Sequence, residues 1–233
     1  LLNPVGSAVD TVNKRLFIAD SGNHRVSVFN LNASGVLVDY TADFILGQPN
    51  FVSSSSGLTQ STMNTPIAVL YDEAGSRLFV SDQTNNRVLV FDLSTGPTTG
   101  MNAAYVLGQA NFTASSAATT QAGLSVPGQL AFDSANQRLF VADATNNRVL
   151  VFDVTAITNG ENAASVLGQT TYTGSGWGTT TSTLTNPVGV AYKAASSTLF
   201  VTDSSNTRVL VFDVTSITNG EEAVNVLGQA NFS

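Results

Sequence analysis

Three polar side chains recur together four times in this chain, in the pattern Asp-x-x-Asn-x-Arg. A carboxylate, an amide and a guanidinium within six residues of one another can bind polar groups of a ligand or supply oxygen ligands to calcium. They can also stabilise the fold through charge-assisted hydrogen bonds. A catalytic site is singular, whereas this set returns with every copy, which favours the structural role. Its members are Asp20, Asn23, Arg25, Asp82, Asn85, Arg87, Asp143, Asn146, Arg148, Asp203, Asn206 and Arg208.

No residue stands out as a catalytic nucleophile or base. The chain has no cysteine, and His24 is its only histidine, so one chain cannot hold zinc through several imidazoles. The other copies have Asn86, Asn147 and Thr207 at the His24 position, which favours a polar turn residue. We retain His24 as a candidate binding residue. We expect no catalytic residue, metal site or cofactor, with calcium as the alternative.

A further aspartate recurs as Asp10, Asp72 and Asp133, but the fourth copy has Lys193 there. A ring of metal ligands would not include this ammonium group. Short acidic side chains commonly hydrogen-bond the backbone of their own turn. We therefore expect these aspartates to stabilise the turns that follow them.

Aromatic residues mark the segments that separate the copies. An aromatic side chain follows each Leu-Gly-Gln sequence, and Tyr172 holds that position in the third copy. It either anchors the segment on a sheet or contributes to binding. Trp177, the only tryptophan, lies between glycines and either covers apolar surface or stacks on a sugar or peptide. We take Trp177 and Tyr172 as candidate binding residues.

The elements that must position these residues are β-hairpins. Residues 139–153 contain two runs of alternating apolar residues separated by Ala-Thr-Asn-Asn, and equivalent segments start at Leu16, Leu78 and Leu199. Alternation with period two is typical of half-buried strands, and asparagine tolerates the backbone of a tight reversal. The aspartate therefore ends one strand, and the arginine begins the next.

The hairpins belong to a tandem repeat of about sixty residues, since the motif aspartate recurs at steps of 62, 61 and 60 residues. Each unit also contains a small-residue strand after a proline and a short strand before Leu-Gly-Gln. We predict first strands at 5–9, 67–71, 128–132 and 188–192, and fourth strands at 43–46, 104–107, 164–167 and 223–227. The predicted core includes Phe79, Val90, Phe140, Val151, Phe200 and Val211.

The repeat resembles the NHL-repeat family, through Arg-Leu-Phe-Val-Ala-Asp-x-x-Asn-Asn-Arg-Val-Leu-Val-Phe-Asp following an Asn-Pro-x-Gly-Val-Ala-type strand. The resemblance implies an all-β fold, a β-propeller built from four-stranded antiparallel blades, with four repeats in this chain. It also implies binding of proteins, RNA or other ligands. One branch of the family contains zinc-dependent lyases, and the single histidine argues against that activity here.

We predict blades at about 1–51, 63–112, 124–172 and 184–233, with linkers between them. Residues 1–233 are then a single propeller domain or part of a longer one. Residue 1 starts a unit and residue 233 ends one, so no strand exchange closes a ring. A partial array, a four-bladed ring and a ring completed by a second chain all fit this pattern.

The amino-acid composition limits the classes of binding partner and the cellular locations that we expect. The net charge is −7, the pI is about 4.4, and only 11% of residues are charged. Nucleic acid and membrane insertion are therefore not expected, because the chain has no basic stripe and no run of 18 apolar residues. The neutral, hydroxyl-rich composition favours an extracellular or cell-surface protein of the bacterial secreted type. The first residues are not a signal peptide.

The functional hypothesis is a non-enzymatic binding or assembly module that engages a protein or glycan, or a second copy of itself. In a four-stranded blade, hairpin turns and inter-blade linkers must lie at the same end. That end is nearly neutral, whereas we assign Asp10, Asp72, Glu73, Asp133, Glu161, Glu221 and Glu222 to the other end. The alternative hypothesis is an atypical hydrolase or lyase of the propeller class with a metal-assisted site.

Overall fold

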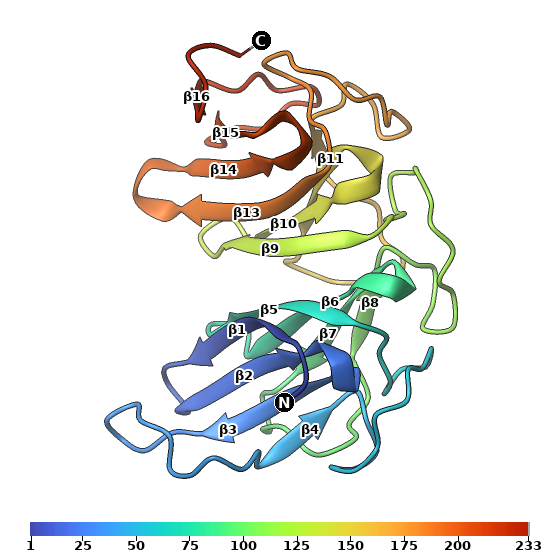
Figure 1. Cartoon of the computed structure of the whole chain (residues 1–233), viewed down its shortest axis with the longest axis vertical. Coiled ribbons are helices and arrows are strands. Elements are labelled where there is room, and N and C mark those ends of the chain that lie inside the picture. The colour runs from blue at the N-terminus through green and yellow to red at the C-terminus, as the bar shows by residue number, and fades with distance from the viewer. Residues whose placement is uncertain (233) are drawn as a thin grey trace. The chain divides into compact units, whose positions relative to one another are not determined.

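The structure is a computed structural model that describes residues 1–232, and Ser233, the end of the predicted fourth blade, lies outside the described residues. The strands form four antiparallel four-stranded sheets, each in sequence order, which we call blades 1 to 4 (Figure 1). The all-β prediction is therefore confirmed. Within residues 1–232, no helix is both long enough and apolar enough to cross a membrane.

The strand bounds agree with the predicted ranges to within two residues. Blade 1 contains β1 (Pro4–Asp10), β2 (Arg15–Asp20), β3 (Arg25–Asn30) and β4 (Phe44–Leu46). Blade 2 contains β5 (Pro66–Asp72), β6 (Arg77–Asp82), β7 (Arg87–Asp92) and β8 (Tyr105–Leu107). Blade 3 contains β9 (Pro127–Asp133), β10 (Arg138–Asp143), β11 (Arg148–Asp153) and β12 (Ser165–Leu167). Blade 4 contains β13 (Pro187–Lys193), β14 (Thr198–Asp203), β15 (Arg208–Asp213) and β16 (Asn225–Leu227).

Each central hairpin turns through one short 3-10 helix. These helices are η1 (Ser21–Asn23), η2 (Gln83–Asn85), η3 (Ala144–Asn146) and η5 (Ser204–Asn206), and η4 (Ala194–Ser196) joins β13 to β14. A left-handed residue then leads into the third strand, with φ of 52° at both Asn86 and Asn147. Asparagine tolerates this conformation better than most residues, so the sequence suits the turn.

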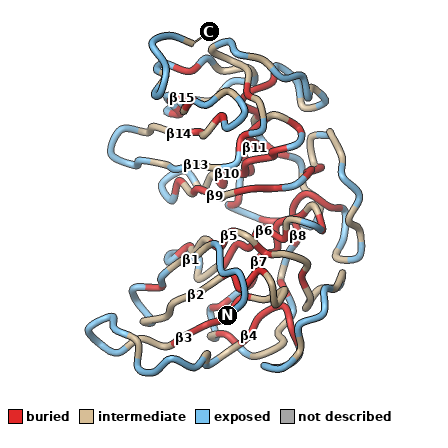
Figure 2. Tube along the Cα trace, viewed as in Figure 1, coloured by how far each residue is buried: buried red, intermediate tan, exposed pale blue. Residues whose placement is uncertain are grey.

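The chain divides into two compact units, Leu1–Ser115 with blades 1 and 2, and Ser116–Ser233 with blades 3 and 4. In the first unit, one face of blade 1 packs on one face of blade 2. Phe17, Val26 and Val28 of blade 1 are buried in the same cluster as Leu78 and Phe91 of blade 2. Figure 2 marks the buried stretches along the strands in red. Hydrophobic burial between sheets is therefore what joins these blades.

The second unit repeats this arrangement. Phe140 and Val151 of blade 3 lie in one buried cluster with Leu199 and Val201 of blade 4. The core prediction is confirmed for Phe79, Val90, Phe140, Val151 and Val211, which are all buried. Phe200 is only half-buried. It points to the opposite side of β14 from Leu199 and Val201, because successive side chains of a strand alternate between faces.

Candidate functional site

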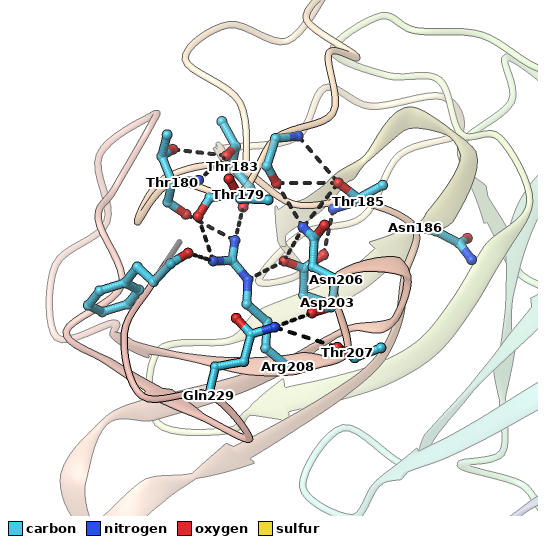
Figure 3. Close-up of polar contacts among 12 residues, drawn as sticks. Thr179, Thr180, Thr183, Thr185, Asn186, Asp203, Asn206, Thr207, Arg208 and Gln229 are labelled. Carbon is cyan, nitrogen blue, oxygen red and sulfur yellow. Dashed lines mark hydrogen bonds and ion pairs between the residues drawn. The ribbon is translucent and has the colours of Figure 1, made fainter.

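The Asp-Asn-Arg set of blade 4 forms one hydrogen-bonded cluster at the hairpin turn (Figure 3). Asp203 Oδ2 accepts bonds from Asn206 Nδ2 at 2.8 Å and from Arg208 Nε at 2.7 Å. Its Oδ1 accepts the backbone N–H of Thr185 at 2.6 Å. The aspartate carboxylate is therefore satisfied by three donors, one of which lies 18 residues earlier in the chain.

The arginine extends this cluster into the linkers, the segments at 47–65, 108–126 and 168–186 that connect successive blades. Arg208 donates to the carbonyls of Thr179, Thr180 and Thr183 in the linker that precedes its blade (Figure 3). It also donates to the carbonyl of Phe232, which follows the blade. One guanidinium thus joins the segments on both sides of its blade.

Blades 2 and 3 contain the same contacts. Arg87 bonds the carbonyls of Thr59, Thr62 and Phe112, and both members of its Asp82 pair are fully buried. Burial raises the pKa of the Asp82 carboxyl, and the charge of Arg87 opposes this effect. The guanidinium donors of this set bind carbonyls of the neighbouring linkers, which indicates a structural role for the Asp-Asn-Arg motif.

A second set of ion pairs lies at the opposite end of the hairpins. Asp72 pairs with Arg77 at 2.6 Å and accepts the backbone N–H of Gly75 at 3.2 Å. Asp10 accepts backbone N–H groups of its own turn in the same way, so the turn prediction is confirmed. The arginine partners were missed. Their signal was spacing, because Asp and Arg recur five residues apart as Asp10 and Arg15, Asp72 and Arg77, and Asp133 and Arg138.

These ion pairs correct the prediction that the aspartates at the end of the blades opposite the hairpin turns form an acidic surface. Asp10, Asp72 and Asp133 are almost fully buried and lie beside Arg15, Arg77 and Arg138, so they do not contribute acidic surface. The prediction treated them as exposed because it did not recognise their partners. Glu161 is half-buried, and burial raises its pKa. Exposed negative charge at this end therefore comes from Glu73 and Glu222 and from the aspartates that end the third strands of blades 2 to 4, which are Asp92, Asp153 and Asp213.

His24 joins two blades within the first unit. It is the left-handed residue after η1, and its Nδ1 accepts the backbone N–H of Thr65 at 3.0 Å. Asn147 Oδ1 has the same role in the second unit, accepting the N–H of Asn186 at 2.8 Å. His24 is half-buried rather than an exposed turn residue, and its acceptor nitrogen is engaged by the backbone.

Tyr172 lies against its own blade. Its hydroxyl donates to the carbonyl of Ala164 at 2.8 Å, and its backbone carbonyl accepts a bond from Arg148. The equivalent residue Phe112 packs on the buried cluster of the first unit. These contacts fit the anchoring alternative for Tyr172 and leave its ring partly exposed.

Trp177 projects from the linker that precedes blade 4, and 77% of its surface is exposed. The backbone on both sides is held: Ser175 O accepts Asn147 Nδ2 at 2.9 Å, and Gly176 O accepts Gln169 Nε2 at 2.7 Å. Gly178 O accepts Asn206 Nδ2 at 2.8 Å. The indole is therefore exposed on a backbone that three side chains hold in place.

The acidic residues do not gather into a metal-binding group. No set of three or more His, Cys, Asp or Glu side chains with suitable geometry occurs in the described part of the chain. The aspartates of the two ion-pair sets lie beside arginines instead, which is an unsuitable environment for a cation.

Comparison with known proteins supports the resemblance found in the sequence. A family model described as NHL repeat matches residues 1–29. NHL repeat-containing protein 2 of Homo sapiens is 35% identical over 95 residues, and its Gallus gallus counterpart is 32% identical over 98 residues. Each alignment covers 41% of this chain and 12% of the relative. The chain therefore spans a small part of these proteins.

A solved structure gives the same fold. A functionally unknown protein from Desulfotomaculum acetoxidans DSM 771 superposes with a TM-score of 0.59 at 16% sequence identity. The match covers 99% of this chain and 59% of that chain. The chain is therefore similar to NHL-repeat proteins, and its four-stranded blades are consistent with a β-propeller fold.

Proposed function

We propose that this array of NHL repeats is a protein-binding module whose contact with its partner centres on Trp177. The single observation that carries the proposal is an indole with 77% exposure on a backbone held by Asn147, Gln169 and Asn206. Large apolar side chains usually avoid such exposure. Tryptophan is also among the residues that most often dominate binding energy at protein interfaces.

The sister linkers show that the fold does not require a large residue there. Ser56 and Ala117 occupy the equivalent positions, and both are exposed. The Gln48 side chain holds the carbonyl of Ser55 at 2.8 Å, as Gln169 holds that of Gly176. Because the backbone frame forms with serine or alanine at this position, the indole of Trp177 is available for binding.

The surroundings of Trp177 suit a protein surface. The linker that carries Trp177, residues 168–186, contains no charged residue and is rich in Ser and Thr. An aromatic anchor surrounded by neutral hydrogen-bonding groups is typical of a protein interface. A held backbone also reduces the entropy lost on binding. We place the module outside the cell or on its surface, a proposal supported by its low lysine content and hydroxyl-rich composition.

Photo-crosslinking at two exposed aromatic positions tests this proposal. Trp177 and Tyr40, which is 92% exposed, are each replaced by benzoylphenylalanine in otherwise identical chains. Each protein is exposed to a secreted-protein fraction and, separately, to immobilised chitin, cellulose and peptidoglycan. We expect adducts with protein from position 177 and none from position 40, and loss of retention of the same proteins with Trp177→Ala.

Two results would reject the proposal. Retention on a polysaccharide that Trp177→Ala abolishes would make the partner a glycan. Binding lost in Tyr40→Ala but retained in Trp177→Ala would move the site to another part of the chain. A crosslink between two copies of this chain at position 177 would identify self-association as the interaction.

A further inference from the structure

His24 and Thr65 form a contact of the first unit whose acceptor can titrate. The Nδ1 atom of His24 accepts the backbone N–H of Thr65 at 3.0 Å, and the His24 ring is half-buried. An imidazole nitrogen accepts a hydrogen bond only while it carries no proton, so the proton of the neutral ring is on Nε2. Uptake of a second proton places an N–H group on both nitrogens and removes the acceptor.

The residue that donates this bond has a strained backbone. Thr65 has a φ of 58°, in the left-handed region, which a β-branched residue rarely occupies. Strain of this kind persists only where surrounding contacts hold the backbone in place. The bond to His24 Nδ1 is one such contact, and a second is the bond from the Gln83 N–H to Thr65 O at 3.3 Å. The left-handed conformation of Thr65 therefore depends partly on the state of the His24 ring.

The second unit contains the equivalent contact with different residue types. Asn147 Oδ1 accepts the backbone N–H of Asn186 at 2.8 Å, and Asn186 has a φ of 53°. A carboxamide oxygen has no proton to gain or lose in ordinary buffers, and asparagine tolerates the left-handed conformation better than a β-branched residue. The second unit thus joins a permanent acceptor to a tolerant residue, whereas the first unit joins a titratable acceptor to a strained one.

The backbone of the acceptor residue is held in the same way in both units. Gln48 Nε2 donates to His24 O at 3.1 Å, and Gln169 Nε2 donates to Asn147 O at 3.0 Å. These bonds do not involve the side chain of the acceptor residue. Protonation of the ring therefore removes the contact with Thr65 and leaves the carbonyl contact of His24 in place.

The charged groups around this contact are already paired. On blade 1, Asp20 pairs with Arg25 at 2.8 Å, and on blade 2, Asp82 pairs with Arg87 at 2.7 Å. Neither the linker at 47–65 nor η2 contains a charged residue. Each arginine favours the ionised form of its aspartate. Histidine is the residue type whose charge normally changes between about pH 5 and pH 8, which makes His24 the responsive group of this contact.

We propose that His24 and Thr65 form a pH-sensitive switch in the first unit. At neutral pH, the bond between them holds Thr65 in its left-handed conformation. As pH falls, His24 takes up a proton, Thr65 loses its acceptor, and its strained backbone relaxes. The end of the linker at 47–65 then separates from the hairpin turn of blade 1, while the contact between Asn147 and Asn186 is unchanged.

Amide hydrogen exchange followed by NMR tests this proposal, because the second unit supplies an internal control. Protection factors, which are corrected for the intrinsic effect of pH on exchange, are measured for the Thr65 and Asn186 amides of the full chain between about pH 8 and about pH 5.5. We expect the protection of Thr65 to fall by about tenfold or more, as the loss of one hydrogen bond allows. The protection of Asn186 should stay constant.

Substitutions in both units separate the two parts of the switch. His24→Asn should keep the Thr65 amide protected and make its protection independent of pH. The pair Asn147→His and Asn186→Thr transfers both residue types to the second unit, and the amide at position 186 should then respond to acid as Thr65 does in the parent. Asn186→Thr alone is the matched control, since it adds strain without a titratable acceptor, and its protection should not depend on pH.

Equal pH dependence of the Thr65 and Asn186 amides in the parent would overturn the proposal, because acid would then loosen both contacts alike. An acid response that persists in His24→Asn would assign the effect to another group, such as Asp82, and would also overturn it. A third contrary result is a proton on Nδ1 of the neutral His24 ring, which long-range ¹H–¹⁵N spectra detect, because that nitrogen could not then accept the Thr65 N–H.

Discussion

Arg148 Nε lies 2.7 Å from Asp143 Oδ2, and neither side chain has any exposed surface. The same guanidinium donates to the carbonyls of Thr120 and Gly123, at 3.0 and 2.8 Å, and to that of Tyr172. One buried cation therefore holds a hairpin turn and two linkers together. Burial raises the pKa of the Asp143 carboxyl, so this aspartate depends on its partners to remain ionised.

Arg148→Ala should destabilise the protein by about 3 to 5 kcal/mol, because it leaves Asp143 and three carbonyls without their partner. Equilibrium urea unfolding measures this loss. Arg25→Ala is the matched control, and it should cost less, because Arg25 is partly exposed and bonds a single carbonyl. Equal unfolding midpoints for Arg148→Ala and the parent would contradict the structural role assigned to Arg148.

Asp133→Asn should reduce the loss of unfolding free energy that occurs as pH falls below about 4. Burial alone would raise the pKa of Asp133, but bonds from Asn136 and Arg138 outweigh it and lower the pKa. The folded-state pKa then lies below the unfolded value of about 3.9, so this stabilisation is present above about pH 4 and is lost as pH falls further. Urea unfolding between about pH 2 and pH 7 measures the slope. The exposed Glu222→Gln serves as control, and identical acid slopes for parent and Asp133→Asn would refute this linkage.

His24→Asn should leave stability nearly unchanged, because Asn147 accepts the equivalent backbone bond in the second unit. His24→Ala should cost about 1 to 2 kcal/mol, since it removes the acceptor for the Thr65 N–H. Thermal unfolding of the three proteins compares them directly. If both variants lose the same stability, the contribution of His24 comes from something other than this hydrogen bond.

Gly128→Ala should destabilise the second unit by about 1 to 3 kcal/mol. A Cβ at this position would lie 2.6 Å from the carbonyl oxygen of Val188, a backbone atom that cannot rotate away. Gly176→Ala is the control, because nothing lies within 4 Å of its added carbon. Thermal unfolding should separate the two variants, and equal melting temperatures would show that the β9 and β13 strands can move apart at low cost.

Repetition made most of the fold predictable from the sequence. Period-two alternation in 139–153 and its three counterparts predicted the hairpins, and markers such as Pro127 located the first strands. These signals are local, because strand side chains alternate between two faces whatever lies beyond them. The aspartates at 10, 72 and 133 were assigned to their turns for the same reason. The pairing register of β10 and β11 could also be predicted from the sequence, because Asp143 and Arg148 directly flank the turn.

The candidate site was less predictable, because its partners are mostly backbone carbonyls. Every residue has a backbone carbonyl, so the residue types at 118–123 do not indicate that these residues accept hydrogen bonds from Arg148. The exposure of Trp177 likewise depends on where its linker lies. The sequence alone could not decide whether the indole covered a blade or faced solvent.

The sequence by itself determined the blades, their order and the repeated polar motif, because these depend on patterns within about fifteen neighbouring residues. The tertiary structure alone decided what the arginines of the motif bind. Arg87 and Arg148 are fully buried and donate to carbonyls of the linker turns that precede their blades. These carbonyls lie about 25 residues away along the chain. The contacts therefore form only when the linkers pack on the blades.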